Sequence, residues 1–293
     1  MTDEVVARRV RVRRALMYPL AFVLVACAWE LYKWVGPAKG GEILGMRFLA
    51  RTDDRAMPHV WKMVQRLGRP EVRVGDDIWL VVTKATWYSF RVALAAFLVG
   101  VLLGMMLAVV MARFKLAERA LMPYLAISQT VPIIVLAPLL AVLIIDVNKD
   151  WVDAKWMPVM ALGVFLAFFP VAVSTLKGLQ STNAAALELM DSYAAGWWKT
   201  LFKLRFPSAV PYILPGLRLA GASAVVGVVV AEISTGVRFG VGRLVLSYGQ
   251  EATSDPPKLY SAVFGAAVLG LVMAALVVGL DRLLRRNLPP ESA

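Results

Sequence analysis

Residues Leu187–Pro207 read LELMDSYAAGWWKTLFKLRFP, a charged segment that interrupts an otherwise apolar chain. Its apolar side chains recur at intervals of three and four residues, which places them on one face of a helix. They are Leu187, Met190, Ala194, Trp197, Leu201 and Leu204. Acidic residues come first and basic residues later, an order that favours the helix dipole. Gly196 predicts a bend into two short helices, and Pro207 predicts the end of the second.

The charged face of this segment has two interpretations. An amphipathic helix can lie passively on the inner leaflet of a membrane, or it can dock on a soluble partner. Glu188 and Asp191 make its first half acidic, which anionic lipid does not favour. The pattern therefore favours docking.

The composition indicates an integral membrane protein. The 293 residues are 59% hydrophobic and 18% charged, with a mean hydropathy of +0.67, whereas soluble domains carry roughly 25% charged residues. The expected fold is all-α and embedded in the lipid bilayer. The net charge of +12 is assigned to basic residues at membrane boundaries, with no nucleic-acid partner. A single cysteine, Cys27, and a single histidine, His59, exclude an intrachain disulfide and disfavour a metal site.

Six apolar stretches, each about long enough to cross a bilayer, predict six membrane helices. They are approximately Ala15–Val35, Trp87–Met111, Ala120–Ile145, Met157–Leu176, Tyr212–Thr235 and Leu259–Leu280. Arginines precede the first stretch and follow the last, and basic loops stay in the cytoplasm. Both termini are therefore expected to be cytoplasmic. Since the first stretch is long and lacks a cleavage pattern, it is expected to be an uncleaved membrane helix.

Three connecting segments are expected on the external side, namely Gly36–Lys84, Asp146–Lys155 and Gly236–Lys258. The first is expected to be a loop on the membrane surface rather than a separate domain. Within it, residues Pro58–Leu67 predict a short amphipathic helix. The apolar face of that helix is expected to carry Val60, Met63, Val64 and Leu67.

Prolines and polar residues interrupt the third stretch. Pro123, Pro132 and Pro138 predict a broken and kinked helix. Gln129 and Thr130 lie beside the central proline, and two roles are open for them. They either satisfy backbone carbonyls freed by the break, or they line a translocation pathway.

Glu232 and Ser234 lie near the outer end of the fifth stretch and are assigned to the same candidate pathway. An acidic side chain in an apolar span is costly and faces a cavity or a partner. Glu232 is therefore expected either in a gate or translocation pathway, or in a structural pair with an arginine. The candidate arginines are Arg218, Arg238 and Arg243. The Asp281–Arg282 pair at the end of the sixth stretch is expected to anchor it at the membrane interface.

The segment Leu187–Pro207 resembles the cytoplasmic loop of binding-protein-dependent ABC importer permeases. That loop is marked by Glu-Ala-Ala, then a Gly, then an ending in Leu-Pro. Glu188 falls on the glutamate, Leu189–Met190 on the two alanines, Ala194 on the glycine and Phe206–Pro207 on the ending. The spacing is kept, although the alanines, the glycine and the leucine are replaced.

Other stretches resemble the nitrate/sulfonate/taurine family of these permeases. Residues Gln129–Leu139 match its third-span motif, and Leu176–Ser181 match the approach to its cytoplasmic loop. Ser192–Tyr193 and Pro211–Ile213 lean toward the branch that imports thiamine-precursor pyrimidines or riboflavin. The resemblance covers roughly Trp87–Arg286, most of the chain.

The resemblance implies a type I ABC importer permease fold (MetI-like) in the inner membrane of a bacterium. Together with the apolar stretches, the resemblance divides the chain into an N-terminus with the first membrane helix, 1–35, an external loop, 36–84, a permease core, 85–286, with a cytoplasmic coupling loop, 177–210, and a cytoplasmic tail, 287–293. It also assigns docking on an ABC ATPase to ten residues of the coupling loop. They are Leu187, Glu188, Met190, Asp191, Ser192, Tyr193, Ala194, Ala195, Gly196 and Trp197.

The same resemblance implies partners. The chain has no Gly-x-x-x-x-Gly-Lys-Ser/Thr phosphate loop, so ATP and Mg²⁺ are expected on a separate ATPase subunit and no cofactor on this chain. An extracytoplasmic binding protein would meet the external loops and deliver a small organic solute, such as a vitamin, a pyrimidine precursor or a sulfonate. A second permease subunit, in this family usually a copy of the same chain, would complete the transporter.

Two other classes of protein stay open at this point. A secondary transporter or channel would need ionisable residues along several spans, and only Glu232 and Glu30 qualify. A membrane enzyme would need a cluster of His, Asp or Cys side chains, which the lone His59 and Cys27 do not supply. The sequence therefore favours the importer permease over both.

Overall fold

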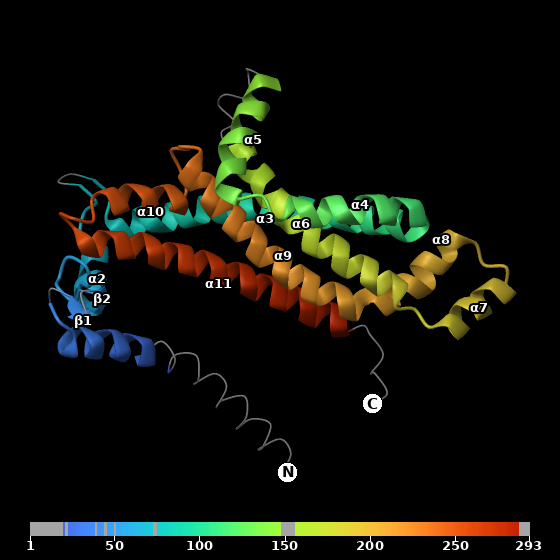
Figure 1. Cartoon of the computed structure of the whole chain (residues 1–293), viewed down its shortest axis with the longest axis horizontal. Coiled ribbons are helices and arrows are strands. Elements are labelled where there is room, and N and C mark those ends of the chain that lie inside the picture. The colour runs from blue at the N-terminus through green and yellow to red at the C-terminus, as the bar shows by residue number, and fades with distance from the viewer. Residues whose placement is uncertain are drawn as a thin grey trace, which may run out of the picture. The chain divides into compact units, whose positions relative to one another are not determined.

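The computed structural model of the chain describes residues 20, 23–38, 40–43, 46–49, 51–72, 75–147 and 156–286 (Figure 1). It divides into two compact units. Unit 1 comprises Met1–Leu80 and Tyr248–Ser261, and unit 2 comprises Val81–Ser247 and Ala262–Ala293. The chain therefore passes from one unit to the other three times, each time within a helix.

Unit 1 contains helical residues 23–35, a short hairpin and a short helix. Strands β1 (Gly41–Ile43) and β2 (Met46–Leu49) pair antiparallel, an element that the sequence analysis did not predict. Helix α2 (Val60–Leu67) confirms the predicted amphipathic helix. Its predicted apolar face is partly wrong, because Met63 is buried but Val64 is exposed.

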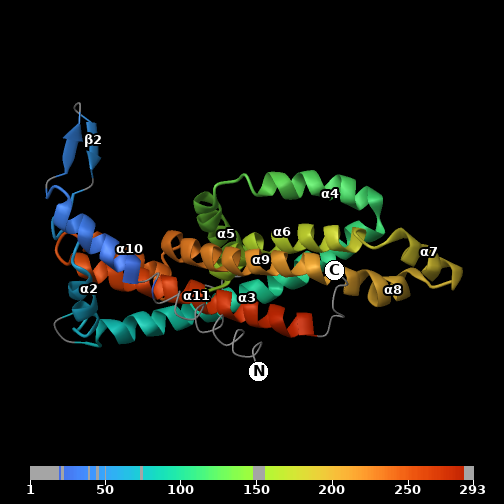
Figure 2. The ribbon, with the colours of Figure 1, turned by 90° about the horizontal axis from the view of Figure 1, so that it is seen from below.

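The regular secondary structure in the described residues of unit 2 is helical, and three of its helices are shared with unit 1. The helices are α3 (Ile78–Arg113), α4 (Lys115–Ser128), α5 (Ile133–Val147), α6 (Trp156–Gln180), α7 (Ala184–Ser192), α8 (Trp197–Thr200), the π-helical turn η2 (Leu201–Arg205), α9 (Phe206–Ser234), α10 (Val241–Gln250) and α11 (Pro256–Arg286). Helix α10 occupies part of the stretch Gly236–Lys258, which was predicted only as an external segment. Figure 2 shows α4 running along α6, and buried side chains of both helices share one apolar cluster.

Four helices in the described part of the chain are long and apolar enough to cross a membrane. They are Ile78–Arg113, Trp156–Gln180, Trp197–Ser234 and Pro256–Leu284. Helices α4 and α5 form a fifth candidate, bent by 106° at the break before Ile133. This break confirms the interruption that the prolines of the third stretch predicted. The first predicted span, Ala15–Val35, lies partly outside the described residues.

Helices α6 and α9 form the centre of unit 2 because their backbones approach closely. A Cβ atom added to Gly227 would lie 2.8 Å from Cα of Gly163, and one added to Gly163 would lie 2.7 Å from Cβ of Ala96. Glycine is the residue that permits such approach between membrane helices. Gly100, on α3, meets α6 in the same way, with its added Cβ 2.8 Å from Cβ of Ala167. The core of unit 2 is therefore built on small residues.

The prediction that Pro207 ends a helix is wrong. Helices α8 and α9 and the π turn between them form one continuous helix, Trp197–Ser234. The N–H of Phe206 donates to the carbonyl of Leu201, five residues earlier, so the turn is wide at this point. Pro207 follows in the first turn of α9, where its fixed φ suits a helix.

Candidate functional site

Helix α7 presents the acidic part of the predicted coupling segment. Asn183 caps its N-terminus, with its side-chain oxygen accepting from the N–H of Ala185 at 2.9 Å. Glu188, Asp191 and Ser192 are exposed, and no residue of α7 is buried. The helix is therefore held by its cap and its own hydrogen bonds while its surface stays open.

A tight turn ends α7 and breaks the predicted single apolar face. The N–H of Ala195 donates to the carbonyl of Met190 at 3.0 Å, and the N–H of Ala194 donates to that of Asp191 at 2.9 Å. This pair of bonds is the Schellman motif, which requires a left-handed residue at its centre. Ala194 supplies it with a φ of 49° and is the one non-glycine residue with positive φ in the described chain. The chain thus keeps at position 194 the backbone shape that glycine adopts most easily.

Helix α8 ties the coupling segment to α3. The guanidinium of Arg113 lies 5.1 Å from the centre of the Trp197 ring, within the range of a cation–π interaction. Trp197 also packs against the apolar core of unit 2, to which the fully buried Leu201 belongs. The bend therefore spans Tyr193–Gly196, and Gly196 lies at the start of α8 with an ordinary negative φ. The ten predicted docking residues lie in α7, in this bend and at the start of α8.

Glu232 lies in a fully buried polar cluster at the C-terminal end of α9. Its Oε1 accepts from the hydroxyl of Ser89 on α3 at 2.6 Å, and its Oε2 accepts from the N–H of Gly242 on α10 at 2.8 Å. The Ser89 hydroxyl in turn accepts from the N–H of Val241 at 2.9 Å. The carboxyl group therefore binds the N-terminus of α10, where helix N–H groups lack partners of their own.

Two glycines make room for this carboxyl group. A Cβ atom added to Gly240, whose φ is +113°, would lie 2.2 Å from Cδ of Glu232, and one added to Gly242 would lie 2.9 Å from its Cβ. The sequence analysis missed Ser89, Gly240 and Gly242 as partners. The glycine-rich stretch that follows Glu232 was the available signal for the two glycines.

The predicted pairing of Glu232 with an arginine is not seen among the described residues. Arg218, one of the candidates for Glu232, forms an ion pair with Asp281 on α11. Asp281 is buried, and the role of the Asp281–Arg282 pair as an anchor at the membrane interface stays a prediction. No hydrogen bond or ion pair within the described residues joins Glu232 to an arginine.

The other predicted pathway residues lie in separate places. Gln129 and Thr130 are exposed at the break between α4 and α5, where the Thr130 hydroxyl donates to the carbonyl of Ile127 at 2.8 Å. Ser234 is the last residue of α9, and its hydroxyl donates to the carbonyl of Val230 at 2.9 Å. Both hydroxyls thus satisfy local backbone carbonyls, and the pathway role of these residues stays a prediction.

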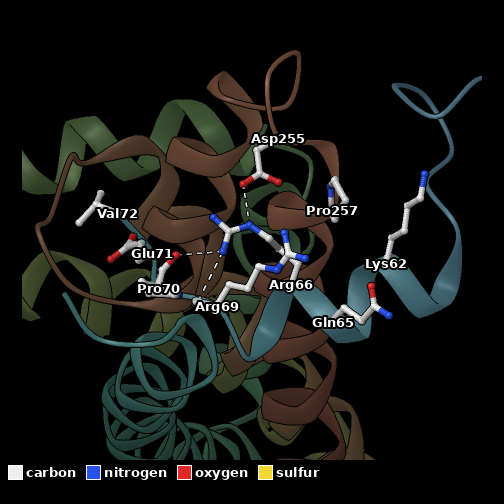
Figure 3. Close-up of a pocket in the computed structure, with 9 residues that line it drawn as sticks. All are labelled: Lys62, Gln65, Arg66, Arg69, Pro70, Glu71, Val72, Asp255 and Pro257. Carbon is white, nitrogen blue, oxygen red and sulfur yellow. Dashed lines mark hydrogen bonds and ion pairs between the residues drawn. The ribbon is translucent and has the colours of Figure 1, made fainter. Parts of the chain in front are cut away.

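Unit 1 contains a hollow of about 680 Å³ with a charged lining (Figure 3). It is lined by Lys62, Gln65, Arg66, Arg69, Pro70, Glu71, Val72, Asp255 and Pro257. Nε of Arg66 donates to Oδ2 of Asp255 at 2.7 Å, and its guanidinium also reaches the carbonyl of Pro70 at 3.0 Å. Arg69 is exposed, and no carboxylate among the described residues pairs with it.

Residues far apart in the chain hold unit 1 together. The Tyr248 hydroxyl donates to Oε1 of Glu71 at 2.8 Å, and burial raises the pKa of that tyrosine, with the nearby carboxylate adding to the effect. Hydrogen bonds from Lys33 and Lys62 lower the pKa of Asp54 to about 2. Polar contacts thus join segments of unit 1 that lie far apart in the chain.

The sequence profile of the family described as "binding-protein-dependent transport system inner membrane component" matches residues 100–288, more than half of the chain. The chain belongs to this family. As a permease subunit of an ABC transporter, it is the non-catalytic, multi-pass inner membrane component of a binding-protein-dependent importer. Membership sets aside the secondary transporter, the channel and the membrane enzyme.

Known relatives agree with this assignment. The permease is 28% identical over 271 residues to the formylaminopyrimidine transport permease protein ThiX of Halalkalibacterium halodurans, covering 92% of this chain and 95% of that one. It is 32% identical to the putative aliphatic sulfonates transport permease protein SsuC of Bacillus subtilis, covering 68% and 66% of the two chains. A solved structure of an amino acid ABC transporter with histidines matches 70% of this chain and 94% of its own, at 17% identity and a TM-score of 0.50. That likeness supports the importer permease fold.

Replacing Ala194 by glycine is expected to stabilise α7 of the permease. A left-handed non-glycine residue costs about 1 kcal/mol, which corresponds to roughly a fivefold change in local opening. Hydrogen exchange of the α7 amides should slow by about that factor. Gly196→Ala is the matched control, because Gly196 has a negative φ and no atom within 4 Å of its added Cβ. Equal effects of the two changes would contradict the strain at position 194.

Removing the Ser89 hydroxyl is expected to loosen α10. Ser89→Ala leaves Oε1 of Glu232 and the N–H of Val241 without a partner, at a cost of about 1–3 kcal/mol. Thermal unfolding of the purified permease should shift to a lower temperature, and proteolysis between α9 and α10 should be faster. Ser234→Ala is the control, since that hydroxyl bonds only within its own helix. If both variants unfold alike, the Ser89 hydroxyl does not hold this cluster.

Proposed function

We propose that this permease imports a small organic solute and that α7, the bend after it and α8 are its coupling element. The observation that carries the proposal is an exposed acidic helix whose following turn leads directly into a membrane-spanning helix. A force on α7 reaches α8, and through it both the continuous helix Trp197–Ser234 and, by way of Arg113, helix α3. Such a connection suits an element that transmits ATP-driven motion to membrane helices.

The ATP chemistry in this proposal belongs to a partner. A separate ABC ATPase would hold ATP and Mg²⁺, and this chain would supply the surface on which it docks. Closure of two ATPases would bias the membrane helices between inward-open and outward-open arrangements. A second copy of the chain would complete the permease, and both termini would lie in the cytoplasm of a bacterium.

The substrate proposal rests on the relatives. Their names specify formylaminopyrimidine, aliphatic sulfonates, riboflavin and taurine. We favour a pyrimidine or a related vitamin precursor, because the formylaminopyrimidine permease aligns along nearly the whole chain. Gln129, Thr130 and Ser234 stay candidates for the pathway, whereas the buried contacts of Glu232 favour a supporting role for that residue.

Unit 1 is the candidate surface for the binding protein. It combines residues from two segments that were both assigned to the external side, and its charged hollow is lined by Arg69, with which no carboxylate of the described residues pairs. Binding proteins present carboxylates as well as apolar atoms, and a free guanidinium can pair with a carboxylate in bidentate geometry. Arg69 is therefore the residue of unit 1 most suited to such a contact.

Reversing the charge at Glu188 is expected to uncouple the transporter. The permease, its ATPase and its binding protein would be reconstituted in liposomes, and ATP hydrolysis would be measured with pyrimidines, riboflavin, sulfonates and nitrate. Glu188→Lys should lower co-purification of the ATPase and abolish solute-stimulated hydrolysis, while Glu188→Gln should have a smaller effect. The proposal fails if no ATPase co-purifies, or if Glu188→Lys leaves both assembly and transport intact.

Reversing the charge at Arg69 is expected to weaken only the binding-protein step. With Arg69→Glu, half-maximal stimulation should require about fivefold more binding protein, as expected for one charge pair at an interface. The ATPase should still co-purify. Arg55→Glu serves as the control, because Arg55 is also exposed in unit 1 but does not line the hollow. Equal weakening by both variants would show a general charge effect and exclude a site at Arg69.

A further inference from the structure

A narrow groove of about 270 Å³ lies between α3 and α11, on the parts of these helices that belong to unit 2. Its floor includes the buried side chains of Val82 and Leu269. Its rim is open, because Trp87, Val268 and Val272 are 60%, 49% and 45% exposed. The groove therefore faces whatever surrounds the two helices.

The position of the groove along both helices places one end of it near the edge of the bilayer. Both helices are candidate membrane spans, and charged residues mark where such spans leave the hydrocarbon. On α11, Gly265 lies three residues inside the charge-free stretch 262–280. On α3, Thr86 lies five residues before Arg91, the last charge ahead of the charge-free stretch 92–112. At 1.5 Å per residue, both helices place this level within about 8 Å of the boundary, where the ester groups of lipids lie.

The lining of the groove changes from polar to apolar along its length. The end near the boundary carries Thr83 and Thr86, and the other end carries Phe90 and Val272. Val82 and Phe90 are eight residues apart, so the groove extends for about 12 Å along α3. One leaflet of a bilayer contributes about 15 Å of hydrocarbon. The groove thus has the length and the polar-to-apolar order of an ester-linked acyl chain.

A hydroxyl at the polar end of the groove has no partner within the described part of the chain. Oγ1 of Thr86 is buried without a hydrogen bond, and a Cβ atom added to Gly265 would lie 2.9 Å from it. Threonine in a helix has two favoured settings of χ1, so rotation about this bond can turn the hydroxyl toward the groove. An unpaired buried hydroxyl is unfavourable, and an acceptor in the groove would offset that cost. Backbone carbonyls of a second membrane helix are bonded within that helix, whereas the ester carbonyl of a lipid is free to accept.

We propose that this groove binds one acyl chain of a membrane phospholipid and that the Thr86 hydroxyl donates to the ester carbonyl of that chain. The chain would lie on Val82 and Leu269 and extend between Phe90 and Val272. It would fill the space between α3 and α11 just beyond the point where Gly265 lets the helices meet. The site is independent of the coupling element, so it stands whether or not α7 docks on an ATPase.

The hydroxyl is tested with two lipids that differ only at the ester. Full-length permease in detergent is titrated with dioleoylphosphatidylglycerol or with its diether counterpart, which lacks the ester carbonyl, and bound lipid is counted by native mass spectrometry. The ester lipid should reach half-occupancy at about fivefold lower concentration, the effect of one hydrogen bond, and Thr86→Val should bring this ratio to about one. Thr175→Val is the matched control, since that hydroxyl is also buried and unpaired in the described chain but does not line the groove. Equal binding of both lipids by the unchanged permease would overturn the inference.

A second variant fills the groove. Val268→Trp places a large side chain in the space that the acyl chain would occupy, so permease purified from membranes should retain one lipid fewer per chain. Leu271→Trp is its control, because Leu271 is 57% exposed on the same helix but does not line the groove. An unchanged number of retained lipids in Val268→Trp would contradict the proposed site.

The same spectra test the other occupants of the groove. If Val268→Trp lowers the mass of the permease oligomer and leaves the lipid count unchanged, a second copy of the chain covers the groove and the inference is overturned. If the unchanged permease retains detergent but no phospholipid from the membrane, the groove holds an adventitious additive only, and the inference falls as well.

Discussion

Helices α6 and α9 pack with backbone against backbone at Gly163 and Gly227, and most of unit 2 takes its position from that contact. Because the two helices touch at glycines, sliding one helix along the other would bring larger side chains into the contact. The pair therefore behaves as one rigid element. Helix α9 continues backward through the π turn into α8 and forward to Glu232. The coupling segment and the buried carboxyl cluster are therefore attached to opposite ends of one helix.

Asp281 and Glu232 are both buried in unit 2, and different contacts offset the free-energy cost of burying each carboxyl group. Asp281 pairs with an arginine that keeps about half of its surface exposed, so the charge remains close to solvent or headgroups. Glu232 has no such partner in the described chain and takes hydrogen bonds from a hydroxyl and a helix N-terminus. The hydrogen bonds of Glu232 fix the position of its carboxyl group, but they stabilise it only when every donor is in place.

The spans within the described residues and the break beside Pro132 could be predicted from the sequence because apolar length and missing N–H groups act locally. The exact ends of the helices and the hydrogen-bond partners of buried polar side chains could not be predicted in this way. The helix passes Pro207 because a π turn precedes it, and nothing in the residue pattern marks that turn. Ser89 lies 143 residues from Glu232, so only the fold brings them together. The polar contacts of unit 1 also join residues far apart in the chain, such as Tyr248 and Glu71, and single-sequence periodicity does not report such pairs.

The signature loop shows why replaced residues did not conceal the family. At position 194 the requirement is a left-handed backbone at the end of α7, where two N–H groups turn back onto the helix. Glycine meets it without cost, and alanine meets it at about 1 kcal/mol. Because the requirement belongs to the backbone, spacing is kept when side chains change. The turn directs α8 toward Arg113 and the core, and this direction, more than the identity of any one residue, connects the acidic helix to the membrane.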